Sequence, residues 1–146
     1  MTGPRDPDFE RRVRESFVRQ KFMATLGATL DGVWPGEVHI GFTHREELTQ
    51  QHGYLHAGVL ASVADSACGY AALSLMEPGA GVLSIEFKIN MLAPATGTRF
   101  VAIGRVVRSG RTITVCTAEV HAEVGTSPVA MMQASMMTVR GKGLND

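Results

Sequence analysis

The feature that most constrains this fold is segment 57–76, which carries a single charged residue, Asp65. A helix with one wet face has polar side chains on that face, whereas almost every side of this segment must lie against apolar partners. Its length of 20 residues would also suffice to cross a bilayer. The segment is rich in Ala, Ser and Gly, however, and alternating sequence follows it. We therefore expect a central helix in a globular domain, without membrane contact.

Alternating apolar and polar residues around this segment predict about five strands. The first begins near Gly36. Four more follow the helix, at about residues 82–91, 100–108, 112–124 and 129–140. Ser109-Gly110 fits a tight hairpin, and the last three connections are short enough for antiparallel pairing. We expect an α+β fold in which a curved antiparallel sheet wraps around the central helix.

The N-terminal segment, residues 1–30, is expected to be helical. Asp6 and Pro7 offer a cap and a first turn, and Gly27 stops the helical pattern after about Leu26. Six of the 14 Lys and Arg residues lie in this segment, which indicates a solvated face or attraction of an anionic ligand. The 146 residues have the size of one domain, 1–146, and we expect residues 141–146 to form a flexible tail.

The composition argues against several classes of function. Fourteen basic and 14 acidic residues leave no basic surplus for binding nucleic acid. Cys68 and Cys116 lie in apolar runs without metal-ligand spacing, which is typical of buried thiols in a reducing cytosol. The N-terminus has no apolar signal core, and no Gly-rich phosphate loop occurs. We expect a cytoplasmic protein that needs no metal or cofactor.

Asp65 is the residue that points most directly to chemistry. A carboxylate in an apolar helix loses hydration, at a cost on the order of several kcal/mol. Either a neighbour such as Ser62 or Ser66 satisfies it, or burial tunes its pKa for a general base or nucleophile. At the helix start, free amides favour an oxygen that becomes negative, and Gly58 would allow close approach. His56 either orients a carbonyl or caps the helix.

The spacing along the helix predicts a site shared between two copies. Gly58 and Asp65 are seven residues apart, which corresponds to about 10 Å of helical rise. A base and an oxyanion donor must lie within a few Å of one carbonyl. If both act on one substrate, the second must come from another copy in a homodimer, for which the uncovered sheet edges and the apolar helix are suited.

The residues around this helix resemble a known motif. His56-Ala57-Gly58, six residues, and then Asp65-Ser66-Ala67 resembles the H-G-G-x6-D-x-A motif of the hotdog-fold PaaI-type acyl-CoA thioesterases. Residues 84–95 are similar to that family's second strand with its following Pro-Ala, and residues 105–112 to its next hairpin. Ala57 replaces the first glycine, and Gln50 stands where many members have asparagine.

The resemblance implies a hotdog homodimer, commonly paired into a tetramer, that hydrolyses acyl-CoA to a free acid and coenzyme A. Asp65 would activate water or attack the thioester. The amide of Gly58, with that of Ala57, would polarise the thioester carbonyl across the dimer interface. His56 and Gln50 would shape that end of the site.

The resemblance also implies roles for residues outside the helix. Ser84 would place the water or the carboxylate. The hairpin arginines are candidates for the phosphates of coenzyme A, because guanidinium pairs well with phosphate oxygens, and solvated hairpin charges are the alternative. The substrate-binding candidates are Ala57, Asn90, Arg108, Gly110, Arg111 and Thr112.

Two other functions are compatible with this fold. One is a non-catalytic acyl-CoA binding or sensor module, although a passive acyl pocket has no use for a buried carboxylate. The other is a hotdog dehydratase or hydratase, whose characteristic helix motif is not found in the sequence. From the resemblance we expect the substrate to carry an aromatic or medium-chain acyl group.

Overall fold

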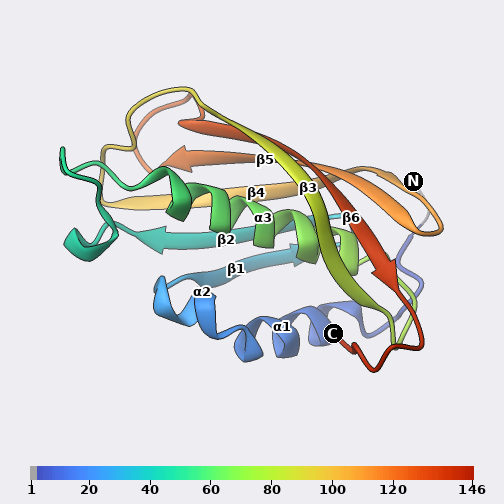
Figure 1. Cartoon of the computed structure of the whole chain (residues 1–146). Helices are drawn as coiled ribbons and strands as arrows, with labels where there is room; N and C mark the ends of the chain where they lie inside the picture. The colour runs from blue at the N-terminus through green and yellow to red at the C-terminus, as the bar shows by residue number, and fades with distance from the viewer. Residues whose placement is uncertain (1–2) are drawn as a thin grey trace.

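The apolar segment forms helix α3 (Ala57–Leu73), as predicted, in a computed structural model that describes residues 3–146. The helix lies along one face of a curved six-stranded sheet (Figure 1). It contacts every strand from β2 to β6, which explains why nearly all of its sides are apolar. Within the described residues, none of the helices has the length and hydropathy needed to cross a membrane.

The sheet is antiparallel, with the strand order β1-β2-β4-β5-β6-β3. Its strands are β1 (Thr29–Trp34), β2 (Glu37–Thr43), β3 (Gly81–Met91), β4 (Arg99–Ser109), β5 (Ile113–Ala122) and β6 (Ala130–Val139). The predicted hairpin at Ser109-Gly110 joins β4 to β5, and Gly110 N–H donates to the carbonyl of Ile113. A short 3-10 helix, η1 (Glu46–Leu48), precedes α3.

Two expectations about the sheet were wrong. The sheet has six strands rather than about five, because β1 lies in a stretch where the register shift between Leu30 and Gly32 breaks the alternation of apolar residues. In addition, β3 does not pair with β4, although the connection between them is short. Residues 92–98 lead away to β4, while β3 pairs with β6 at the edge of the sheet.

The N-terminal helical segment is interrupted where a single helix was expected. Helix α1 (Phe9–Arg19) and helix α2 (Lys21–Thr25) are separated by Gln20, whose backbone is extended (φ −78°, ψ 95°). Gly27 follows with a positive φ of 68°, as its predicted role as a stop requires. The two helices lie beside β1 (Figure 1).

Arg12 of α1 caps the C-terminal end of α3. The guanidinium is buried, and it donates to the carbonyls of Leu73 and Met76, each at 2.9 Å, and of Glu77 at 2.6 Å. The Asp6 carboxylate lies 3.4 Å from the same side chain. Carbonyls at a helix end lack partners within the helix and carry partial negative charge. This arginine therefore belongs to the interior, not to the solvated face that the sequence indicated.

Residues 141–146 contain no helix or strand, yet they lie against α1 and β3. Ser16 Oγ donates to Asp146 Oδ1 at 3.2 Å, and Val82 N–H donates to Asp146 Oδ2 at 2.7 Å. The flexibility expected for this tail stays a prediction.

Arg12→Ala should lower the free energy of unfolding by about 3 kcal/mol, because it leaves buried carbonyls without a donor and Asp6 without a partner. Denaturant unfolding followed by circular dichroism measures the change. Arg14→Ala is the matched control, since Arg14 is exposed and pairs with Glu10 one turn away. Such surface pairs contribute about 0.5 kcal/mol or less. Equal effects of the two substitutions would contradict the capping role.

Candidate active site

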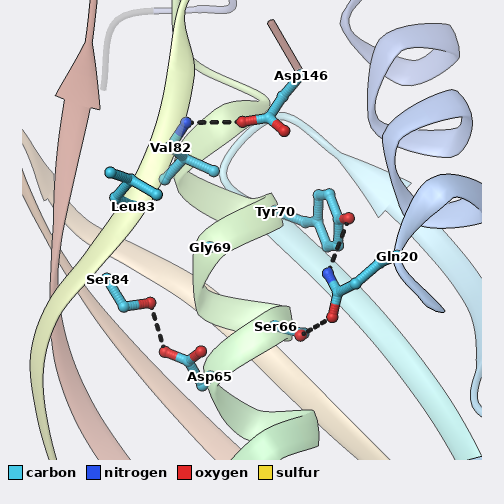
Figure 2. A pocket seen from close by; sticks show the side chains of 9 residues that line it. All are labelled: Gln20, Asp65, Ser66, Gly69, Tyr70, Val82, Leu83, Ser84 and Asp146. Carbon is cyan, nitrogen blue, oxygen red and sulfur yellow. Dashed lines mark hydrogen bonds between the residues drawn. The ribbon is translucent and has the colours of Figure 1, made fainter. Parts of the chain in front are cut away.

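Asp65 lies in the middle of α3 with a half-buried carboxylate that faces β3 (Figure 2). Ser84 Oγ donates to Asp65 Oδ1 at 2.7 Å. Burial raises the pKa of the Asp65 carboxyl above its ordinary value, and the hydrogen bond from Ser84 opposes this rise. The structure thus brings together two of the residues that the sequence proposed for catalysis.

The helix serines do not satisfy Asp65, although they were the alternative partners considered. Ser62 Oγ donates to the carbonyl of Gly58 at 2.7 Å. Ser66 Oγ donates to Gln20 Oε1 at 2.9 Å. The carboxylate is therefore held from β3, and its second oxygen stays available to a substrate or a water molecule.

A cavity of about 230 Å³ opens beside Asp65, between α3, the start of β3 and the break between α1 and α2 (Figure 2). Gln20 lines it from the break and donates through Nε2 to the Tyr70 hydroxyl at 3.0 Å. Burial raises the pKa of Tyr70, so its hydroxyl stays protonated at neutral pH. Sequence reasoning missed Gln20, because no pattern in the sequence marks the break that turns it towards α3.

The start of α3 forms a separate part of the candidate site. His56 Nδ1 accepts a hydrogen bond from Gly58 N–H at 2.8 Å, so the histidine caps the helix, which was one of its two expected roles. The N–H of Gly58 is therefore occupied. The N–H of Ala57, the first residue of α3, has no acceptor within the helix.

Gln50 lies beside Ala57. Its Oε1 accepts from His52 N–H, which orients the side chain and leaves Nε2 to donate elsewhere. Both residues line a second cavity, of about 460 Å³, with apolar walls from Leu60 and Met91. His56 and Gly58 line a third, of about 350 Å³. None of these four residues lines the cavity beside Asp65, in keeping with the separation that helical rise predicts.

The remaining substrate-binding candidates lie away from Asp65 in a single chain. Asn90 is on β3, six residues beyond Ser84 and so about 20 Å further along the strand. The β4–β5 hairpin lies beyond the C-terminal end of α3 (Figure 1). The hairpin carries Arg108, Gly110, Arg111 and Thr112, and its backbone is held by hydrogen bonds from Arg140 to Arg111 O and from Thr138 N–H to Thr112 O.

β3 is an edge strand, and several of its apolar side chains are exposed to solvent. Leu83, Ile85 and Phe87 are each about half exposed, at 46%, 52% and 47%. An edge strand of this kind presents free backbone donors and acceptors to another strand. These features support pairing with a second copy, next to Ser84.

No group of three or more His, Cys, Asp or Glu side chains among residues 3–146 is arranged to hold a metal ion. Both cysteines are buried, as the sequence indicated. Burial raises the pKa of the Cys116 thiol to about 12 and that of Cys68 further. Neither thiol is therefore a nucleophile at neutral pH.

Comparison with known proteins identifies the family. The sequence model of the thioesterase superfamily matches residues 52–129, which is just over half of the chain. A Saccharolobus solfataricus protein, provisionally named as an esterase, is 34% identical over 84 residues, which are 58% of this chain and 59% of that relative. The chain therefore aligns with less than two thirds of this relative's length.

Solved structures show the same fold. A thioesterase family protein from Silicibacter pomeroyi is 50% identical, with a TM-score of 0.89 over 91% of this chain and 99% of that one. The Escherichia coli PaaI protein from the phenylacetic acid degradation operon is 20% identical, with a TM-score of 0.84 over 92% of this chain and 95% of that one. The second likeness concerns the fold alone. Together they confirm the predicted α+β hotdog fold and the resemblance to PaaI.

Asp65→Asn should raise the free energy of unfolding at pH 7, because it removes a half-buried charge and keeps an oxygen that accepts from Ser84. The raised pKa means that the folded chain binds the Asp65 proton more tightly than the unfolded chain does. The parent therefore loses stability as pH rises through that pKa, and the variant's advantage should shrink between pH 7 and pH 4. Denaturant unfolding at both pH values measures this, and an advantage that grows at pH 4 would contradict it.

Proposed function

This chain belongs to the thioesterase superfamily, and we propose that it hydrolyses acyl-CoA to a free acid and coenzyme A. The observation that carries the proposal is the Asp65 carboxylate, fixed by Ser84 beside a cavity and raised in pKa by burial. A general base is most effective when its pKa lies near the working pH, and burial moves this carboxyl in that direction.

In the proposed reaction, Asp65 takes a proton from a water molecule that attacks the thioester carbon. Ser84 occupies Oδ1 through its hydrogen bond, so Oδ2 is the oxygen that faces the water. The tetrahedral intermediate collapses with loss of the coenzyme A thiolate, which takes up the proton. Direct attack of Asp65 on the thioester is the alternative, and it gives a mixed anhydride that water then hydrolyses.

The carbonyl oxygen would accept hydrogen bonds from Ala57 N–H and Gln50 Nε2. Both donors line one cavity, and neither is used within its own helix or turn. Ala57 thereby takes the role that the sequence gave first to Gly58, whose N–H is held by His56. His56 holds the helix start in place as a cap. Removal of one such donor typically lowers kcat by about 100-fold to 1,000-fold.

Two copies of the chain would complete each site. Ala57 and Asp65 are eight residues apart, or about 12 Å of helical rise, which keeps Asp65 of one copy from the carbonyl that Ala57 of that copy binds. Pairing along the β3 edge would cover Ser84 and bring the partner's helix start to Asp65. We propose a homodimer, paired further into a tetramer, with Arg108, Gly110, Arg111, Thr112 and Asn90 as contacts for coenzyme A.

Asp65→Asn should lower kcat at least about 100-fold, because the amide cannot accept the water proton. Thiol release from a panel of aryl, short-chain and medium-chain acyl-CoA esters measures the change. Asp8→Asn, an exposed position on the N-terminal segment, is the control and should match the parent. Undiminished turnover by folded Asp65→Asn would overturn the proposal. Tight binding of acyl-CoA by the parent without thiol release would favour a binding module instead.

Mixing two inactive variants tests the shared site. Asp65→Asn and Gln50→Ala should each be nearly inactive alone. Random mixing of subunits makes half of the dimers mixed, and one of the two sites in each mixed dimer is intact, so about one quarter of the parent activity returns. If Asp65 and Gln50 acted within one chain, every site in the mixed dimers would carry a substitution, and no activity would return.

A further inference from the structure

The cavity beside Asp65 is kept open by Gly69. Gly69 lies one turn beyond Asp65 on the same face of α3, and it lines the cavity (Figure 2). Apart from its chain neighbours and the adjacent backbone of α3, a Cβ atom built at this position meets nothing within 4 Å. Glycine is unfavourable in a helix relative to alanine, and no neighbouring side chain or strand requires it here. The position therefore provides space, and any larger side chain would fill the cavity.

The far wall of the cavity is polar. Ser66, Gln20 and Tyr70 form a hydrogen-bonded chain across it, at 2.9 Å and 3.0 Å. Ser16 Oγ lies 3.3 Å from the Tyr70 hydroxyl and fixes its position from α1. After these bonds, the second hydrogen of Gln20 Nε2 and the lone pairs of Ser66 Oγ are still free to contact a ligand. The wall can thus both donate to and accept from a polar group.

The dimensions decide which part of a substrate the cavity can take. A volume of about 230 Å³ beside the reacting carboxylate is too small for the pantetheine and nucleotide of coenzyme A, but it accommodates a compact acyl group. We propose that this cavity receives the acyl group and selects a compact one with a hydrogen-bonding substituent at its far end. Gly69 sets the size limit and Gln20 the polarity. This inference rests on the thioesterase activity proposed above.

The size limit is tested with Gly69→Ala and Gly69→Leu on straight-chain acyl-CoA esters from acetyl to decanoyl. Gly69→Leu should lower kcat/KM for chains of six or more carbons at least about tenfold, and for acetyl-CoA less than about twofold. Gly69→Ala should fall between Gly69→Leu and the parent. Ala24→Leu adds the same apolar side chain to exposed α2 and should leave the profile unchanged.

Retained turnover of acetyl-CoA shows that the fold, the assembly and the chemistry of each variant are intact. Losses that are equal for all chain lengths, or no loss for any, would overturn the assignment of Gly69. If Gly69→Leu fails to fold, the length profile of Gly69→Ala decides the same question.

The polarity is tested with pairs of acyl-CoA esters that differ only in a hydroxyl group at the end of a four- to eight-carbon chain. The parent should prefer the hydroxylated member by about tenfold in kcat/KM, the effect of one good hydrogen bond. Gln20→Leu should reduce this preference below about twofold. Gln133→Leu, an exposed glutamine on β6, is the matched control and should keep it.

The outcomes separate this inference from the proposed function. No thiol release by the parent from any acyl-CoA would overturn the proposed function. Thiol release by the parent, without a preference for the hydroxylated esters or with a preference that Gln20→Leu leaves unchanged, would overturn the polarity assignment alone.

Discussion

The burial of α3 is the constraint on which the rest of this structure depends. Five strands cover most of the helix, yet one face of it stays uncovered in a single chain. That face carries Gly58, Ser62, Asp65, Ser66 and Gly69, which are small or polar. Asp65 lies on this face, where its carboxyl is only half-buried and the rise of its pKa is smaller than full burial would cause. The same uncovered face therefore carries both the half-buried carboxylate and the cavity next to it.

The N-terminal segment contacts the central helix α3 at two points. Arg12 satisfies carbonyls at the C-terminal end of α3, and Gln20 reaches the uncovered face one residue from Asp65. Arg12 lies on α1 and Gln20 at the end of it, and α1 and α2 lie beside β1 (Figure 1). A segment that looked from its charges like a solvated helix thus fixes the position of the central helix and forms part of the cavity wall.

The predictable parts of the fold are those that a periodic pattern controls. Helix α3 and strands β2, β4, β5 and β6 follow from apolar spacing, because each packs its apolar residues against the core. β3 follows from the same alternation, although Leu83, Ile85 and Phe87 are about half exposed. β1 was missed because its bulge at Leu30 and Gly32 interrupts the alternation. The break at Gln20 was missed because neither glycine nor proline marks it in the sequence, and its side-chain hydrogen bonds to Ser66 and Tyr70 are visible only in the structure. A short connection shows that two strands can pair, but it does not predict that β3 pairs with β6 instead of β4.

How far the positions of the candidate site residues could be predicted differs from residue to residue. Asp65 could be singled out from the sequence, because a lone carboxylate in an apolar helix loses hydration and therefore requires compensation. Ser84 could be placed beside it only through the family resemblance, since the two residues are distant in sequence. The occupancy of Gly58 N–H depends on the orientation of the His56 ring, which sequence spacing does not report. That single hydrogen bond shifts the proposed carbonyl donors to Ala57 and Gln50.

Assembly and chemistry are coupled through the same surface. Asp65 is half-buried and Ser84 is exposed in one chain, and both border the open edge of β3. A second copy on that edge would remove water from the carboxylate and raise its pKa further. The hydrogen bond from Ser84 would then stabilise the charged carboxylate more strongly, because electrostatic interactions strengthen as water leaves. Pairing of two copies would thus act on the pKa of Asp65 in two ways: burial would raise it, and the hydrogen bond from Ser84 would oppose the rise.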